Sequence, residues 1–182
     1  LQPESSRTFE AGLRTVRENL EASATIYNVK FDDRLLGIAR CAGIVGCAGA
    51  FANVGQVDST GAEVAVQWRV NKAFDLFGSV SDNDSQYGSD YLDGATVIPA
   101  DGKQVVDAPK LLVALEATWR WEQFDVRLGA KYTDKRYITY LNDSEVDSFW
   151  VVDATVGYEF GQIGFVDSLR AQLNLANLFD EE

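Results

Sequence analysis

The stretch GAEVAVQWRV, from Gly61 to Val70, alternates apolar side chains with mostly polar ones. The apolar positions are Ala62, Val64, Val66, Trp68 and Val70, and the positions between them hold Glu63, Ala65, Gln67 and Arg69. A period of two residues is typical of a β-strand whose two faces meet different surroundings. Those surroundings could be a protein core and water, as in a soluble sheet, or lipid and a wet lumen, as in a membrane barrel.

Similar alternation recurs along the rest of the chain. The eight alternating segments are 8–15, 20–31, 57–70, 73–81, 109–120, 123–133, 148–160 and 169–177. No long window shows a helical period, so the sequence predicts an all-β fold, an antiparallel meander of about eight long strands. The second and fourth segments are less regular, which would suit a bulge in either of them.

The connections between these segments alternate between short and long. The short turns fall near 17–19, 71–72, 121–122 and 161–168, and the long connections span 32–56, 82–108 and 134–147. Strict alternation places every short turn at one end of the sheet and every long loop at the other. Outer-membrane barrels are arranged in this way, with short periplasmic turns and long extracellular loops. The pattern therefore predicts part of a transmembrane outer-membrane β-barrel.

Aromatic residues gather at the two ends of the predicted apolar face. The expected membrane-facing aromatic belt consists of Trp68, Trp119, Phe124, Trp150, Tyr158 and Phe160. Amphipathic rings favour the membrane–water interface, so Val64 and Val66 between the two ends would meet lipid. Glu63 and Gln67 would then face a water-filled lumen. In the alternative interpretation the rings cap the core of a soluble sheet.

The composition excludes several classes of function. The net charge is -12 and the sequence pI is about 4.4, which disfavours binding to nucleic acid. The chain contains no histidine, the usual general base and the commonest metal ligand. We therefore predict that the chain is not an enzyme and that it holds no metal and no resident cofactor. It shows neither a secretory signal nor an apolar run long enough for a transmembrane helix.

Two features suggest a piece of a larger barrel. The predicted lumen face carries too many charges to fill a narrow eight-stranded interior, whereas a wider barrel leaves such groups wet. The chain also ends in Asp180-Glu181-Glu182 rather than on an aromatic strand. Two alternatives stay open, namely a small self-contained outer-membrane barrel with a structural or adhesive role, and a soluble lipocalin-type barrel that binds a ligand inside.

Three groups of residues resemble segments of TonB-dependent outer-membrane receptors and occur in the order of that family. They are LQPESS (1–6) with FEAGL (9–13), NVGQV (53–57) with GAE (61–63), and NLFD (177–180), the last resembling a motif on the penultimate strand. The resemblance covers nearly the whole chain. It implies that residues 1–182 are the C-terminal part of a barrel of about 22 strands. It also implies that the plug domain, the TonB-contacting segment, the earlier strands and the final strand lie outside this chain.

The same resemblance implies active transport across the outer membrane of a Gram-negative bacterium. Receptors of this family take up a scarce ligand such as an iron–siderophore chelate, cobalamin or a glycan. Their energy comes from the inner-membrane proton gradient through the plug. The expected partners are the TonB complex, lipopolysaccharide and outer-membrane lipid, and a small extracellular ligand.

The long loops hold the candidate site residues. Cys41 and Cys47 lie in the first long loop, where an oxidising compartment permits a disulfide across the short intervening segment. The aromatic candidates for ligand contact on the two later loops are Tyr87, Tyr91, Tyr137 and Tyr140. Their rings would suit stacking on a chelate or sugar, and they would suit ordinary loop packing equally well.

The stretch DNDSQYGSDYLD, from Asp82 to Asp93, has oxygen-bearing residues at spacings similar to a calcium-binding EF-hand loop. The glycine required at its sixth position is Tyr87, and its last residue is aspartate rather than glutamate. A true EF-hand is therefore not expected. Loose divalent bridging to lipopolysaccharide and a plain solvated loop remain open for this stretch.

Overall fold

The computed structural model describes residues 3–38, 50–53, 55–93 and 96–181. Eight long antiparallel strands form one sheet, in the order β1-β2-β5-β6-β9-β10-β13-β14. Their bounds are β1 Ser5–Val16, β2 Leu20–Asp32, β5 Val57–Arg69, β6 Phe74–Tyr87, β9 Leu111–Trp121, β10 Phe124–Thr133, β13 Phe149–Ile163 and β14 Val166–Leu175. The predicted all-β meander is confirmed, because each strand pairs with its neighbour in the chain order of the eight long strands.

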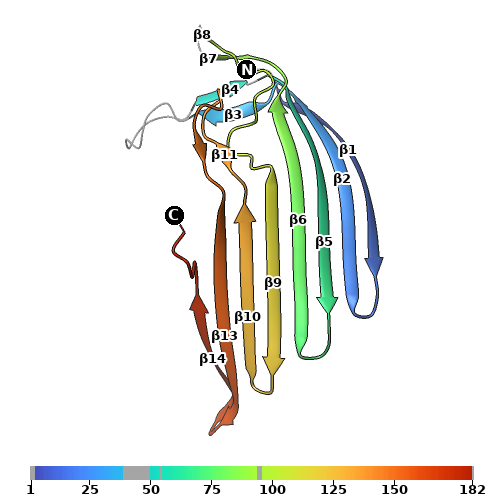
Figure 1. The fold of residues 1–182 in the computed structure, drawn as a ribbon, viewed down its shortest axis with the longest axis vertical. Helices are drawn as coiled ribbons and strands as arrows, with labels where there is room; N and C mark the ends of the chain where they lie inside the picture. Colours follow the sequence, from blue (N-terminus) through green and yellow to red (C-terminus); the bar gives the residue numbers. More distant parts are fainter. Residues whose placement is uncertain (1–2, 39–49, 54, 94–95, 182) are drawn as a thin grey trace.

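Short turns and long connections lie at opposite ends of the sheet, as the sequence predicts (Figure 1). The long connections contain three small hairpins that the sequence did not predict. These pair β3 (Leu35–Ile38) with β4 (Ala50–Asn53), β7 (Tyr91–Asp93) with β8 (Thr96–Ile98), and β11 (Arg136–Tyr137) with β12 (Glu145–Val146). We call the end with the long connections the outer end.

The largest boundary error concerns β6. The sequence predicts that this strand ends at residue 81, but β6 continues to Tyr87 and pairs with β5 along its full length. The extension is polar apart from its last residue, so it lacks the apolar alternation that marks the other strands. Neighbouring backbone nevertheless satisfies its hydrogen bonds, and this pairing overrides the weak local pattern.

The register gathers the apolar side chains on one face. Val64 pairs with Val80, which pairs with Val113, and the same row continues through Tyr132 to Trp150. Residues one position along each strand point to the other face, which carries most of the charged groups. The predicted division into an apolar and a polar face is confirmed across the sheet.

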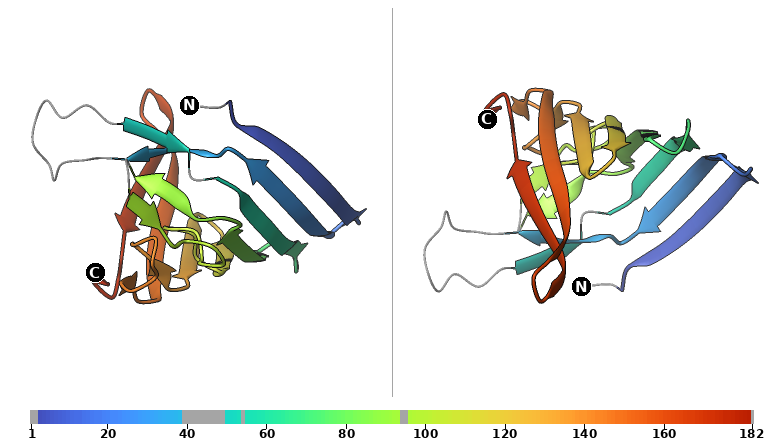
Figure 2. Two further views of the ribbon diagram at one scale, coloured as in Figure 1. Left: turned by 90° about the horizontal axis from the view of Figure 1, so that it is seen from above. Right: turned by 90° about the horizontal axis from the view of Figure 1, so that it is seen from below.

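The sheet is curved and open (Figure 2). β1 and β14 each pair on one side only within the part of the chain that the structure describes. The register is regular in β2 and β6, where the sequence left room for a bulge. It shifts instead between β13 and β14, near Gly161 and Ile163. Among the described residues there is no helix long and apolar enough to cross a membrane.

Candidate functional site

The connection between β6 and β9 folds back on the outer end of β6. Tyr87 donates its backbone N–H to Lys103 O at 2.9 Å and accepts from Gly102 N at 2.8 Å, and Val105 N donates to Ser85 O at 3.0 Å. Residues 102–105 therefore run beside β6 as a short added strand. We call the segment 99–107 the strap.

The strap buries a small core against the polar face of the sheet. The buried residues are Val57, Tyr87, Ala100 and Val105, with Phe31, Ile98, Ala108 and Tyr140 packed around them. Beside this core, the hydroxyls of Ser59 and Ser85 lie 2.6 Å apart and share a hydrogen bond, which satisfies two buried polar groups. The strap is thereby packed against the outer ends of β5 and β6.

This packing corrects the prediction for Tyr87. The sequence places Tyr87 on a loop as a ligand contact, but it is the last residue of β6 and only 1% exposed. Its hydroxyl accepts a hydrogen bond from Val106 N at 3.3 Å. A ring so enclosed holds the strap in place and offers no surface to a ligand.

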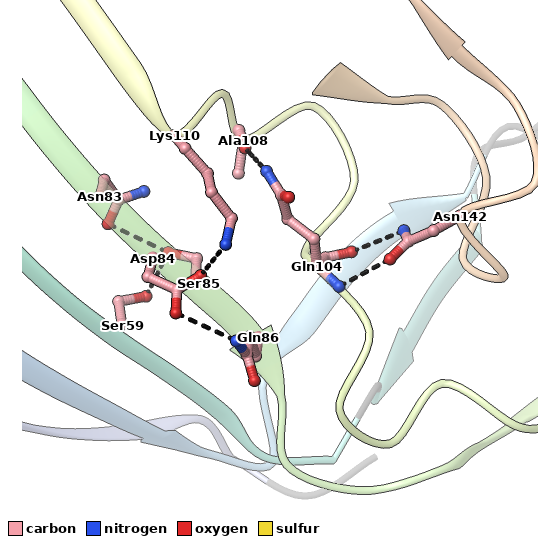
Figure 3. Close-up of polar contacts among 9 residues, drawn as sticks. All are labelled: Ser59, Asn83, Asp84, Ser85, Gln86, Gln104, Ala108, Lys110 and Asn142. Atoms are coloured by element: carbon pink, nitrogen blue, oxygen red, sulfur yellow. Dashed lines mark hydrogen bonds and ion pairs between the residues drawn. The ribbon is translucent and has the colours of Figure 1, made fainter. Parts of the chain in front are cut away.

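The strap is joined to the connection between β10 and β13 (Figure 3). Asn142 Nδ2 donates to Gln104 O at 3.0 Å, and Asn142 Oδ1 accepts from Gln104 N at 2.8 Å. Arg136 Nε lies 2.7 Å from Asp107 Oδ1, and Asp107 N donates to Tyr137 O at 2.9 Å. These contacts make the two connections one ledge, which we define as residues 99–107 with 134–148.

The remaining tyrosines occupy different parts of the outer end. The Tyr140 ring lies 5.7 Å from that of Tyr87 and packs against the buried core. Tyr137, in β11, is partly buried, and Lys135 Nζ lies 5.6 Å from the centre of its ring. Tyr91 is the first residue of β7. The structure thus brings Tyr87 and Tyr140 together.

Lys135 is held within its own connection. Its Nζ donates to Glu145 Oε2 at 3.0 Å, and this hydrogen bond raises the pKa of the Lys135 ammonium. Arg136 Cζ also lies 5.7 Å from the centre of the Phe149 ring. Lys135 and Arg136 are therefore already paired with carboxylates and rings, and the ledge also presents two exposed aliphatic side chains, Ile138 and Leu141.

The stretch with EF-hand-like spacing is not a calcium loop. Asp82, Asp84 and Gln86 belong to β6, whose extended backbone cannot wrap around an ion. Asp84 instead pairs with Lys110 at 2.7 Å and accepts from Gln86 Nε2 at 3.0 Å. Within the described ranges no three Asp, Glu, Cys or His side chains come together as a metal site would require. Cys41 and Cys47 lie outside the described residues, and their disulfide stays a prediction.

Ion pairs line the polar face near the short turns. Asp75 binds two guanidinium groups, that of Arg69 at 3.4 Å and that of Arg120. Further pairs join Arg14 to Glu21, Arg127 to Glu116 and Arg170 to Asp125. Most of these groups are half exposed, so each pair contributes little to stability. Their alternation of sign keeps this end of the polar face close to neutral.

In two places on the polar face, side chains bridge strands that are not neighbours. Tyr27 on β2 donates to Asn83 Oδ1 on β6 at 3.1 Å, over Gly61 of β5. Arg170 on β14 reaches Asp125 on β10 over Gly157 of β13. In both places the middle strand has a glycine where any other side chain would meet the bridge.

The rings expected in the belt share the apolar face. Ring centres of Trp119 and Trp121 are 6.1 Å apart, those of Trp121 and Phe124 6.5 Å, and Tyr158 lies 4.6 Å from both Phe124 and Phe160. Tyr132 and Trp150 form a separate pair at 5.2 Å nearer the outer end. Trp121 was missed because the sequence places it in a turn, whereas it is the last residue of β9.

The motif NLFD lies just beyond β14 rather than on it. Asn177 N donates to Asp153 Oδ1 at 2.9 Å, and Leu178 N donates to Val152 O at 2.8 Å. The Asn177 amide also exchanges two hydrogen bonds with the backbone of Glu181. The motif therefore forms a turn tied to β13, and the prediction that it lies within a strand is wrong by a few residues.

The family model described as "TonB dependent receptor-like, beta-barrel" matches residues 1–178. The chain belongs to this family. The resemblance seen in the three sequence motifs is thus confirmed for the barrel domain of TonB-dependent receptors, and the fold is that of a transmembrane outer-membrane barrel wall.

Individual relatives agree with the family. The ferrichrome outer membrane transporter/phage receptor of Escherichia coli K12 is 25% identical over 191 residues, which cover 99% of this chain and 23% of that protein. The match to the siderophore receptor PiuA from Acinetobacter baumannii covers 97% of this chain and 24% of the PiuA chain, with a TM-score of 0.76 and 23% identity. The match to the ferric yersiniabactin uptake receptor FyuA from Yersinia pestis covers 98% of this chain and 25% of the FyuA chain, with a TM-score of 0.74 and 16% identity.

The chain spans about a quarter of the length of these relatives. TonB-dependent receptors are outer-membrane proteins of Gram-negative bacteria, and the chain is assigned to that membrane. They are receptors and transporters rather than enzymes, which agrees with the expectation from the sequence.

Proposed function

We propose that this chain is part of an outer-membrane receptor for TonB-dependent active uptake of a scarce ligand, with an iron–siderophore chelate as the first candidate. The supporting observation is the separation of an apolar face from a polar face across all eight long strands of a barrel of this family. The names of the relatives, which include a ferrichrome transporter and siderophore receptors, favour an iron chelate over cobalamin or a glycan.

In this proposal the apolar face meets lipid. Val64, Val66 and Leu115 are all at least a third exposed although they are aliphatic, which is costly in water and favourable in a bilayer. The belt of Trp68, Trp119, Phe124, Trp150, Tyr158 and Phe160, with Trp121 added, marks the membrane interfaces. Because lipid cannot satisfy backbone groups, the open edges of β1 and β14 would pair with further strands of the same barrel.

The polar face would line the lumen. Earlier strands and a final strand outside residues 1–182 would complete the barrel around a plug domain, and energy would reach the cargo through contact of the plug with the TonB complex. The charged side chains of the polar face, such as Glu63 and Arg127, are exposed in the structure and are suited to face a hydrated plug.

Ligand contacts are assigned to the ledge and its surroundings. Tyr137 and Tyr140 lie on the ledge, and Tyr91 lies on the neighbouring hairpin. Tyr87 supports the strap beneath them instead of touching cargo. The exposed Ile138 adds an apolar contact that the sequence analysis did not single out.

Neither alternative from the sequence is favoured. A small closed barrel would pair its first strand with its last, whereas β1 and β14 lie at opposite ends of the sheet order in the described part of the chain. A lipocalin-type barrel would turn its apolar face inward around a shared core, whereas the buried core here lies on the polar face under the strap. Lipopolysaccharide and outer-membrane lipid remain the proposed surroundings of the apolar face.

Uptake measurements on the complete receptor test the function. Cells with and without the gene would be grown under iron limitation and supplied with labelled ferric hydroxamate, ferric catecholate, ferric citrate or cobalamin. We expect one ferric chelate to depend on the gene and on TonB. If uptake of every compound, and growth on iron, were the same in both strains, the proposal would be wrong.

A further inference from the structure

Two cations face each other on the apolar side of the first hairpin. Arg7 of β1 and Lys30 of β2 are direct antiparallel partners, and both lie on the same face as Phe9 and Ile26. Like charges placed directly opposite each other destabilise a sheet. Lys30 is only loosely compensated by Asp58, at 3.8 Å with both side chains about half exposed. The pair therefore favours an external anion.

An apolar groove begins directly below these cations. It has a volume of about 660 Å³, and its membrane-facing walls include Phe9, Ala11, Ile26 and Ala62. A second groove of about 400 Å³ continues it along the same strands, past Leu13, Ala24 and Val64. The two share Ala11, Ile26 and Ala62, so they form one track running from the outer end toward the middle of the strands. Two of the three shared positions, Ala11 and Ala62, hold small side chains that leave the track open.

We propose that Arg7, Lys30 and this track form a binding site for a phosphate-bearing lipid of the outer leaflet. The phosphate would bind the two cations and one acyl chain would occupy the track. The inference rests on the proposed placement of the apolar face in the membrane. It goes beyond that placement by naming a particular site and the chemistry of its occupant.

The position of the cations supports a lipid headgroup. A barrel strand crosses the hydrocarbon in roughly ten residues, and β1 runs from the turn after Val16 up to Arg7 in about that length. Arg7 and Lys30 thus lie where phosphates of the outer leaflet are found. A guanidinium binds phosphate in a bidentate manner, and an ammonium adds a second charge.

The neighbouring carboxylates do not cancel this charge. Asp84 borders the groove but is paired with Lys110 at 2.7 Å. Asp82 borders it from β6, on the far side of β5 from Lys30. Asp58 of β5, the direct partner of Lys30 on the same face, offsets at most one of the two charges. Arg7 and Lys30 together therefore keep a net positive charge at this end of the track.

Lipid binding to the complete receptor tests the site. The receptor would be reconstituted in phosphatidylcholine nanodiscs and titrated with lipid A carrying its phosphates, and with the same lipid A after enzymatic removal of the phosphates. We expect Arg7→Gln with Lys30→Gln to weaken binding of phosphorylated lipid A about 30-fold, about fivefold for each cation near the surface. Binding of the dephosphorylated lipid should not change.

Matched variants separate charge from fold. Arg17→Gln with Lys72→Gln removes the same charge from the short-turn end and should leave binding unchanged. Arg7→Lys with Lys30→Arg keeps both charges and should stay within about threefold of the unmodified receptor. Ala62→Phe fills the track and should weaken binding of both lipids.

Three outcomes would overturn the site. In the first, the double glutamine variant binds phosphorylated lipid A as tightly as the unmodified receptor does. In the second, the control variant at Arg17 and Lys72 loses as much affinity as the double glutamine variant. In the third, inorganic phosphate displaces the lipid fully, which would indicate a free-anion site. Cargo uptake measured on the same variants keeps the two proposals distinct. If the unmodified receptor takes up cargo normally but does not bind phosphorylated lipid A, only this site is refuted. If it binds the lipid but takes up no cargo, only the transport function is refuted.

Discussion

Tyr27 and Asn83 are hydrogen-bonded at 3.1 Å although a complete strand lies between them. The phenol of Tyr27 crosses β5 above Gly61, where a Cβ atom would come within 2.4 Å of Tyr27 Oη and of the backbone oxygen of Asp82. The polar face is thus braced across three strands at a point where only glycine fits.

Replacing Gly61 should therefore destabilise the barrel. We expect Gly61→Ala to cost about 1–3 kcal/mol, because the new methyl group meets a rigid ring and a backbone atom. Gly129→Ala is the matched control, since a Cβ there has no neighbour within 4 Å. Urea unfolding of the receptor in lipid vesicles measures both. Equal unfolding midpoints for the two variants would show that the bridge over Gly61 exerts no steric constraint.

The division into two faces predicts opposite responses to a new charge at adjacent positions. Val66→Arg should cost about 2–4 kcal/mol if the side chain lies near the bilayer midplane, whereas Gln67→Arg on the polar face should cost little. The same residue type is introduced at two consecutive positions of one strand, so the two variants differ mainly in the face that receives the charge. Folding free energies in vesicles are the measurement, and similar penalties at both positions would reverse the face assignment.

The ledge depends on one asparagine. Asn142 has a φ of 55° and makes both hydrogen bonds to Gln104. Asn142→Gly keeps the backbone conformation and removes the two bonds, so amide hydrogen exchange at residues 102–107 should speed up by about tenfold, equivalent to roughly 1.4 kcal/mol for the lost pair. Lys135→Gln, which breaks an ion pair inside one connection, should leave that exchange unchanged.

Asn177 combines a backbone role and a side-chain role that two variants can separate. Its φ is 51°, and its amide bonds twice to the backbone of Glu181. Asn177→Gly should lose only the side-chain bonds, whereas Asn177→Ala should add about 1–2 kcal/mol for a left-handed conformation. Thermal unfolding should rank alanine below glycine. The opposite ranking would mean that the turn relaxes to a different backbone conformation.

Tyr87 and Tyr137 should behave differently in ligand binding. Tyr87 is enclosed, so Tyr87→Phe removes only its bond to Val106 N and should leave cargo affinity unchanged while slightly loosening the strap. Tyr137→Ala should weaken cargo binding directly, by about 0.5–1.5 kcal/mol if the ring stacks on the ligand. Equilibrium binding of the ferric chelate identified by uptake, together with exchange in the strap, distinguishes a supporting ring from a contacting one.

Local sequence was sufficient for the strands and their faces because both depend on a period of two. Each of the eight predicted segments overlaps one long strand, and the row from Val64 to Trp150 follows from alternation and nearest-neighbour pairing alone. The order of short and long connections was equally visible, since consecutive antiparallel strands need no crossover. Family membership was also readable, because its motifs are short and contiguous.

The candidate site was only partly predictable. Its tyrosines were found because aromatic residues in long loops are easy to see, yet the burial of Tyr87 depends on the strap returning to cover it. Asn142 and Gln104 were missed, since an asparagine and a glutamine in polar loops carry no pattern until the fold places them opposite each other. Arg7 and Lys30 were missed for the same reason, as their pairing requires the register of the first hairpin.

By itself, then, the sequence determined that this chain is a set of amphipathic strands in a TonB-dependent receptor barrel, because alternation, turn length and short motifs are local properties of the chain. Only the tertiary structure decided where β6 ends, which loops join into the ledge and which side chains cross at Gly61. Those features arise between residues far apart in sequence, and their energies depend on contacts that exist only after the sheet has formed.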